Sequence, residues 1–163
     1  MSLASPATWT VTAVPVDHPD SVPVLRAYMD ELISRYYGRP AEEEEIAALM
    51  ADNADLLDDR GILLLARAGA TPVACIGIRW IAPGTGELTR VFVTRDARRG
   101  GAGRRLVGAA EDAARERGAT RILLNTRKDL TEAIALYTAL GYRPTDPYGD
   151  DPYAELWLAK DLG

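Results

Sequence analysis

The segment VFVTRDARRGGAGRR runs from Val91 to Arg105 and carries the strongest structural signal in the chain. It places an apolar strand before a glycine-rich turn, and the residues after the turn predict a helix. The first backbone N–H groups of a helix have no acceptor within the helix, and the aligned peptide dipoles add partial positive charge there. Because Gly101 and Gly103 have no Cβ, an anion can approach their amides closely. The stretch therefore predicts a phosphate-binding turn.

Positive charge is concentrated in this segment, although the chain of 163 residues carries a net charge of −5. Six arginines stand between positions 90 and 105: Arg90, Arg95, Arg98, Arg99, Arg104 and Arg105. The acidic total disfavours a nucleic-acid partner, whereas the local cluster favours a small anionic ligand. On this segment alone, a surface turn with solvated arginines is an open alternative.

Two common phosphate-binding motifs do not fit the segment. A P-loop requires Gly-x-x-x-x-Gly-Lys-Ser/Thr, and no lysine follows these glycines. A dinucleotide fingerprint requires Gly-x-Gly-x-x-Gly, and Leu106 stands where its third glycine would be. The ligand is therefore expected to be a different phosphate compound.

Hydrophobic periodicity predicts the order β-α-α-β-β-β-α-β-α-β-β along the chain. Strands are expected over residues 8–14, 61–68, 73–81, 87–93, 121–125, from 142 onward, and over 153–158. Helices are expected to begin near residues 21, 42, 101 and 129. This order predicts an α+β fold with a mixed, mainly antiparallel sheet, in a single domain that spans residues 1–163 with a core of about 8–160.

Two motifs resemble the GNAT superfamily of N-acetyltransferases. Arg98-x-x-Gly101-x-Gly103, after a strand that ends in valine, is similar to that family's Gln/Arg-x-x-Gly-x-Gly/Ala motif. The segment AIALYTALGY, from Ala133 to Tyr142, is similar to its Ala-x-x-Leu-Tyr-x-x-x-Gly-Phe/Tyr hallmark. The resemblance covers almost the whole chain and looks closest to a bacterial subgroup that acts on small molecules. It implies a GNAT fold, with a splay between the parallel strands that end near residues 93 and 125.

The resemblance implies acetyl-CoA, or another acyl-CoA, as the co-substrate. Backbone N–H groups of the glycine turn would bind its pyrophosphate, and the preceding strand would pair with its pantetheine arm. The residues expected at the cofactor are Val91, Phe92, Val93, Arg98, Arg99, Gly100, Gly101, Ala102, Gly103, Arg104, Asn125, Leu130 and Tyr137. The chain departs from the family at Leu130, where many members have an asparagine that holds the arm, and Asn125 is the candidate substitute.

Glu87 and Tyr137 are the candidate catalytic residues. A free alkylamine has a pKa near ~10.4, so a base must accept a proton before the amine can attack. The family often places its base where Glu87 stands, and strand periodicity puts Glu87 on the same face as Val91 and Val93. The alternative for Glu87 is an exposed residue after a turn. Tyr137 occupies the family's general-acid position, although its helical stripe is also typical of a packed core tyrosine.

The acceptor pocket is expected between the first two helices and the loop before the last strand. Its candidate residues are Tyr36, Tyr37, Trp80 and Asp150, with Asp146 and Asp151 nearby. Aromatic rings beside acids suit a cationic amine, such as a polyamine, an aminoglycoside or a peptide N-terminus. Solvation of the loop is an alternative role for the acids.

Several function classes lack support in the sequence. The single histidine, His18, and the single cysteine, Cys75, predict neither a metal site nor an intrachain disulfide. No apolar run approaches about eighteen residues, the length that suggests a membrane span. The N-terminal residues lack the pattern of a signal peptide, so a cytoplasmic location is expected.

We therefore expect an N-acetyltransferase that moves an acetyl group from acetyl-CoA to a primary amine of a small molecule or peptide. The reaction is expected to be a direct attack in a ternary complex, with Glu87 as general base and Tyr137 as general acid. The alternative is a catalytically degenerate acyl-CoA sensor. A homodimer is expected only because members of the family that this chain resembles commonly dimerise.

Overall fold

A computed structural model describes residues 5–98 and 100–163 of the chain. Its centre is a seven-stranded sheet with strand order β1-β2-β3-β4-β5-β7-β6. The strands are β1 Thr10–Val14, β2 Gly61–Ala68, β3 Thr71–Ala82, β4 Thr85–Val93, β5 Arg121–Thr126, β6 Arg143–Pro144 and β7 Leu156–Asp161. The helices are α1 Ser21–Tyr37, α2 Glu43–Met50, α3 Ala102–Glu116 and α4 Thr131–Ala139, and the short 3-10 segments include η1 Pro6–Thr8 and η2 Ala54–Leu56. The predicted element order and α+β class are confirmed.

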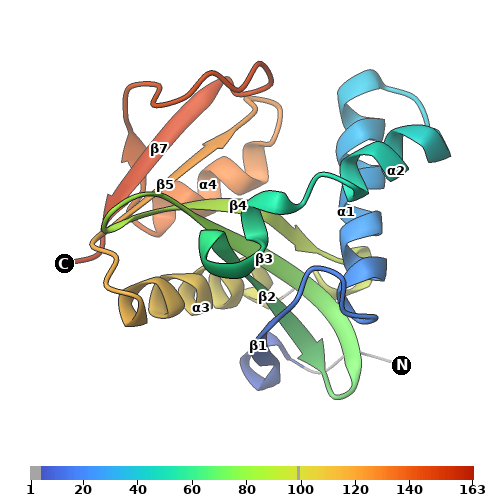
Figure 1. Cartoon of the computed structure of the whole chain (residues 1–163), viewed down its shortest axis with the longest axis horizontal. Coiled ribbons are helices and arrows are strands. Elements are labelled where there is room, and N and C mark those ends of the chain that lie inside the picture. The colour runs from blue at the N-terminus through green and yellow to red at the C-terminus, as the bar shows by residue number, and fades with distance from the viewer. Residues whose placement is uncertain (1–4, 99) are drawn as a thin grey trace.

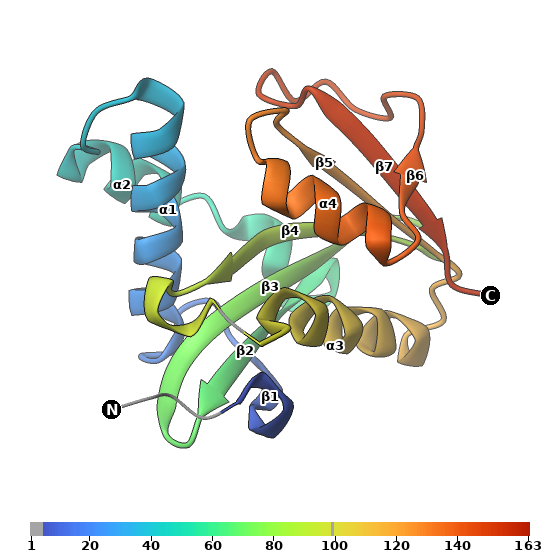
Figure 2. The same ribbon diagram turned by 180° about the vertical axis from the view of Figure 1, so that it is seen from behind.

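The parallel strands β4 and β5 pair along only part of their length. Their pairing joins Thr85–Glu87 to Arg121–Leu123, while the other strand pairs of the sheet are antiparallel. Beyond this shared end the two strands diverge, as both views of the ribbon show (Figure 1 and Figure 2). The predicted splay is therefore confirmed, and it leaves the carboxyl-terminal half of β4 open on the side of β5.

The two faces of the sheet carry different layers. Helices α3 and α4 cover the face that is in front in Figure 2, over a core that includes Ile76, Ile78 and Leu106. Helix α1 and the segment η2 cover the opposite face, over a second core that includes Leu25 and Leu56. Because side chains alternate along a strand, Cys75 of β3 belongs to the second core, whereas its neighbours Ala74 and Ile76 belong to the first.

A β-bulge in β4 changes which side chains share a face. Arg90 and Val91 together stand opposite Ile76 of β3, and Arg90 has a positive φ of 51°. The extra residue reverses the alternation of side chains beyond it. Glu87 therefore lies on the α1 side, whereas Val91 and Val93 pack against the core under α3. The prediction that these three residues share one face was wrong.

Several strand boundaries also differ from the prediction, by one to three residues. Strand β7 begins at Leu156 and not at Tyr153, because the Tyr153 N–H donates to Oδ1 of Asp151 at 2.9 Å in a turn. Strand β1 begins at Thr10, after the 3-10 turn η1. The first difference matters for function, because it leaves Tyr153 on a loop.

Candidate active site

A cleft of about 580 Å³ lies at the splay of β4 and β5. Its walls come from α1, α2, η2, β3, β4, β5, α4 and the loop before β7. The predicted site residues that line it are Tyr36, Tyr37, Glu87, Val91, Asn125, Leu130 and Tyr137. Sequence reasoning had not assigned Tyr28, Arg79, Arg127 and Tyr153 to the site, although all four line the cleft. They stand on different elements, so no local motif could have joined them.

Glu87 is buried in the wall of the cleft, with 3% of its surface exposed. The pairing of β3 with β4 places it opposite Arg79, whose Nε donates to Glu87 Oε1. The other oxygen, Oε2, is buried and has no hydrogen-bond partner among the described residues. The alternative of an exposed glutamate was therefore wrong. A buried carboxylate with one unengaged oxygen is chemically suited to accept a proton.

Tyr137 lies on α4, lines the same cleft and is 5% exposed. Its ring packs edge-on against Tyr142, with 5.7 Å between the ring centroids. Burial raises the pKa of the Tyr137 hydroxyl, so the phenol stays protonated at neutral pH. Core packing and a position on the cleft wall are thus compatible in this residue.

The glycine turn leads into α3 without a side-chain cap. Gly101 has a left-handed φ of 84°, which favours glycine. The first hydrogen bond of α3 joins the Arg105 N–H to the Gly101 carbonyl at 2.9 Å, so the amides before Arg105 precede the helical ladder. Gly103 allows α3 and α4 to approach closely, because a Cβ at this position would lie 2.6 Å from Cδ2 of Leu136 on α4.

The end of β4 presents backbone groups to the splay. The Thr94 N–H donates to the Val73 carbonyl of β3 at 2.8 Å. Neighbouring peptide groups along a strand point in opposite directions, so the Val93 N–H and carbonyl point away from β3. The Val93 carbonyl accepts a hydrogen bond from Nε of Arg98 at 2.7 Å.

Comparison with known proteins identifies the family. The profile of the acetyltransferase (GNAT) family matches residues 26–142. The chain belongs to the GNAT family. The IAA acetyltransferase of Azospirillum brasilense is 37% identical over 138 residues, a match that covers 81% of this chain and 87% of that protein. The chain is accordingly an acyl-CoA-dependent N-acyltransferase, and acetyl-CoA is the co-substrate that this family uses.

Solved structures share the GNAT fold of this chain. A GNAT acetyltransferase of Staphylococcus aureus superposes with a TM-score of 0.76 at 15% identity, over 96% of this chain and 100% of that one. The PaiA N-acetyltransferase of Thermoplasma acidophilum, solved in complex with coenzyme A, superposes with a TM-score of 0.71 at 18% identity, over 94% and 99%. At these identities the likeness establishes the fold.

The arginines of the GNAT glycine segment are largely engaged within the protein. Arg98 contacts Glu31 of α1 at 2.8 Å, and Arg105 donates to the Trp9 carbonyl at 3.2 Å. Arg104 is exposed at the start of α3. Arg99 lies outside the described residues. The cluster is therefore not one uniform anion site.

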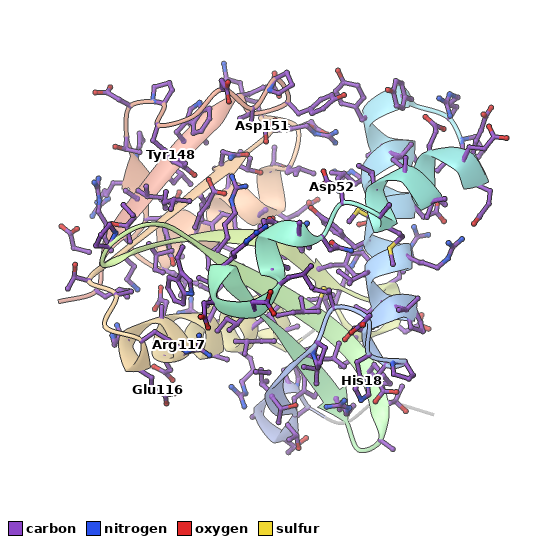
Figure 3. The ribbon with its side chains drawn as sticks, viewed as in Figure 1. His18, Asp52, Glu116, Arg117, Tyr148 and Asp151 are labelled. Atoms are coloured by element: carbon purple, nitrogen blue, oxygen red, sulfur yellow. The ribbon has the colours of Figure 1, made fainter. Side chains whose placement is uncertain are left out.

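Arg90 has a structural role that was not predicted from the sequence. It is 8% exposed, and its Nε donates to Asn53 Oδ1 at 2.9 Å. Its terminal nitrogens donate to both carboxylate oxygens of Asp55, at 2.9 and 3.0 Å, and to the carbonyl of Asp52 at 3.0 Å. Figure 3 shows Asp52 on the segment after α2. Arg90 thus fixes one wall of the cleft and is fully occupied there.

Aromatic side chains form the mouth of the cleft. Tyr36, Tyr37 and Tyr153, here called the tyrosine rim, are 49%, 52% and 52% exposed. The Tyr36 ring stands edge-on to both others, at 4.9 Å between centroids in each pair. The guanidinium of Arg127 lies over the Tyr36 ring at 5.4 Å and also pairs with Asp129. The rim joins the end of α1 to the loop before β7.

Three predicted site residues lie elsewhere. Trp80 faces the α3 side, beside Ala119, because it is the neighbour of the cleft residue Arg79 on a strand whose side chains alternate. Phe92 packs with Tyr28 in the core under α1, at 5.9 Å between centroids. Asp150 does not line the cleft, whereas its neighbour Asp151 does, on the loop labelled in Figure 3. The side chains of Trp80 and Asp150 therefore do not line this cleft.

Two negative findings apply to residues 5–98 and 100–163. No helix in these ranges is long and apolar enough to cross a membrane. No group of three or more His, Cys, Asp or Glu side chains in the same ranges is placed to hold a metal ion. The thiol of Cys75 is fully buried and donates to the Arg90 carbonyl at 3.3 Å.

Proposed function

We propose that this GNAT enzyme transfers an acetyl group from acetyl-CoA to a primary amine of a small molecule or peptide, by direct attack in a ternary complex. The observation that carries the proposal is the convergence of the buried Glu87 carboxylate and of Tyr137 on one cleft at the β4–β5 splay. A covalent acyl-enzyme has no support, because the Cys75 thiol is buried in the core.

The proposed donor site runs from the start of α3 to the splay. The amides of residues 101–104 would bind the pyrophosphate, supported by the uncapped helix start. The Val93 N–H and carbonyl would pair with the pantetheine arm, since they point away from β3. The Val91 main chain, Asn125 and Leu130 lie along the same path on the cleft wall.

The proposed reaction transfers two protons and replaces the C–S bond of the thioester by a C–N bond. The lone pair of the neutral amine attacks the thioester carbonyl carbon, the C–N bond forms, and the C–S bond then breaks. Glu87 receives the proton that the amine loses, and Tyr137 supplies a proton to the departing CoA thiolate. The raised pKa of the Tyr137 hydroxyl keeps the phenol protonated, so that it can donate a hydrogen bond to the sulfur as negative charge develops there.

The proposed acceptor carries an aromatic or other flat apolar group beside its amine. The tyrosine rim offers about half-exposed aromatic side chains at the mouth of the cleft, although Arg39 lies over the Tyr37 ring and Arg127 over the Tyr36 ring. The arginines of the cleft are each paired with a carboxylate: Arg79 with Glu87, Arg90 with Asp55, and Arg127 with Asp129. Apolar contact is therefore the larger source of selectivity that the site offers. The name of the Azospirillum relative, an IAA acetyltransferase, makes IAA a compound to test.

The test is an acceptor panel with acetyl-CoA, followed by release of the CoA thiol. The panel contains tryptamine, spermidine, IAA and a peptide with a free N-terminus. We expect the arylalkylamine to have a higher kcat/KM than the polyamine. We also expect Tyr36→Ala to reduce this preference while the KM for acetyl-CoA stays unchanged.

Two outcomes would count against the proposal. Tight binding of acetyl-CoA in calorimetry, without thiol release with any amine, would favour the acyl-CoA sensor instead. A preference for spermidine that Tyr36→Ala leaves unaltered would overturn the role of the tyrosine rim but keep the amine acetyltransferase.

A further inference from the structure

One arginine at the mouth of the cleft is held between an aromatic ring and a carboxylate. The guanidinium of Arg39 lies over the Tyr37 ring, 4.6 Å from its centroid. Its terminal nitrogens also donate to both carboxylate oxygens of Glu45, at 2.8 and 3.0 Å. An aromatic face attracts a cation, and the carboxylate adds charge attraction to the same group. Ring, cation and carboxylate thus form one three-part contact.

A second contact of the same kind lies across the rim. The guanidinium of Arg127 lies over the Tyr36 ring at 5.4 Å, and its nitrogens donate to both carboxylate oxygens of Asp129, at 3.0 and 3.1 Å. Two of the three rings of the tyrosine rim therefore carry a cation that the protein itself supplies.

The third ring, that of Tyr153, has a carboxylate beside it but no such cation. Asp151 stands on the same loop (Figure 3), and its Oδ1 accepts a hydrogen bond from the Tyr153 N–H at 2.9 Å. Both residues are exposed and line the cleft. Within residues 5–98 and 100–163, no lysine or arginine pairs with Asp151 or lies over the Tyr153 ring. This pair lacks the cation that completes the other two contacts.

The charges of the cleft wall also leave Asp151 unbalanced. The other carboxylates that line the cleft are each paired with an arginine: Glu45 with Arg39, Asp55 with Arg90, and Glu87 with Arg79. One unpaired negative charge at the mouth attracts a cationic ligand and repels an anionic one. The part of the acceptor that reaches Asp151 should therefore be positive.

That positive group is distinct from the reacting amine. Glu87 is 3% exposed in the cleft wall, whereas Asp151 is exposed on the loop at the mouth. The reacting amine must also lose its proton before it attacks, and a carboxylate in contact with it would favour the charged form. A cation that stays at Asp151 is therefore a second group of the acceptor.

We propose that the acceptor is an arylalkylamine with a second cationic group, distal to the reacting amine, and that Asp151 and the Tyr153 ring bind this group at the mouth of the cleft. The inference rests on the proposed function, because it names the class of amine that the enzyme acetylates. Asp151 and Tyr153 are specificity-determining residues and take no part in proton transfer.

The kinetic test compares two acceptors of equal shape and different charge. They are para-(aminomethyl)phenyltrimethylammonium and para-tert-butylbenzylamine, each with one reacting amine. The wild type should favour the cationic acceptor by about five- to tenfold in kcat/KM, since an exposed ion pair and a cation–π contact each contribute modestly. Asp151→Asn should reduce this ratio to about twofold or less through the KM of the cationic acceptor, with kcat and the KM for acetyl-CoA unchanged. The asparagine oxygen can still accept the Tyr153 N–H, so the loop is preserved.

Asp150→Asn is the matched control. It removes the same charge one residue earlier, from a side chain that does not line the cleft, and should keep the wild-type ratio. Tyr153→Leu should lower the ratio, because the aromatic face is lost. A wild-type ratio near one, or an equal effect of Asp150→Asn and Asp151→Asn, would overturn the proposal.

A binding measurement tests the cation site without turnover. Calorimetric titration of the full chain with phenyltrimethylammonium, in the presence of CoA, should show about fivefold weaker binding to Asp151→Asn than to the wild type and to Asp150→Asn. If neither amine is acetylated, the proposed function fails, and this titration decides the cation site by itself. Equal affinity of the three proteins would overturn the site, whatever the enzyme acetylates.

Discussion

The guanidinium of Arg98 donates to both carboxylate oxygens of Glu31, each at 2.8 Å. The pair joins the GNAT glycine segment to helix α1, and the Arg98 Nε also holds the Val93 carbonyl. The arginine that the motif assigns to an anionic cofactor is thus shared with an acid of the protein. A phosphate of the cofactor and the Glu31 carboxylate would therefore compete for the Arg98 guanidinium.

This competition predicts opposite effects for the two partners. Arg98→Ala should weaken CoA binding by about tenfold, because a charge-assisted contact is lost. Glu31→Gln should tighten it by about two- to fivefold, since a partly exposed pair contributes about 0.5–1 kcal/mol. Isothermal titration with CoA measures both. Arg95→Ala is the control, because that side chain is 84% exposed and reaches Glu31 only at 3.7 Å; a change as large as that of Arg98→Ala would contradict the assignment.

Three glycines of the same region should respond differently to alanine. Gly101→Ala should destabilise the fold by about 1–2 kcal/mol, because its φ of 84° is left-handed. Gly108→Ala, inside α3 with open space around it, should stabilise by about 0.5–1 kcal/mol. Gly103→Ala should fall between them, since the clashing atom is the flexible end of Leu136. Denaturant unfolding gives the order, and equal values at all three sites would refute it.

Arg90→Ala should cost about 3 kcal/mol of unfolding free energy, because it leaves Asp55 and Asn53 without their buried partner. Urea unfolding measures the loss, with the exposed Arg95→Ala again as reference. We expect acceptor turnover to fall as well, because η2 forms a wall of the cleft. A loss below 1 kcal/mol, on the order of a surface pair, would show that the Arg90 side chain is not needed to hold η2 against β4.

Tyr137→Phe should lower kcat by about a hundredfold, a common size for the loss of a general acid, with the KM for acetyl-CoA almost unchanged. The packing against Tyr142 survives because the ring is kept. Steady-state kinetics across the acceptor panel measures the effect. Turnover like that of the wild type would remove the acid role and leave Tyr137 as a core residue.

The buried thiol predicts both reactivity and alkaline stability. Burial raises the pKa of Cys75 from 9.0 to about 12, so native protein should react with a chromogenic disulfide reagent at pH 8 only as fast as it unfolds. As the pH rises above 9, the unfolded chain loses this proton first, so stability should fall between about pH 9 and 12. Cys75→Ala should show a shallower decline. Rapid labelling of the native thiol would contradict its burial.

The acyl donor was predictable from sequence because its signals are local. The order of strand, glycine turn and helix, together with the ALYTALGY segment, lies within short windows whose backbone geometry follows from neighbouring residues. The element order followed from periodicity for the same reason. The face of Glu87 relative to Val93 could not be predicted, because one bulge residue with positive φ at Arg90 reverses the alternation.

The acceptor side depended on contacts between residues far apart in the chain. Tyr36 meets Tyr153, and Tyr148, on the loop before β7, packs against Trp157, the strand partner of Asn125. The engagement of Arg98 by Glu31 is of the same kind. The GNAT fold and the glycine turn before α3 could be predicted from the sequence alone, since backbone propensity and motif spacing encode both. Only the tertiary structure decided which charges are free and which rings face the cleft, because burial and pairing arise when separate elements pack together.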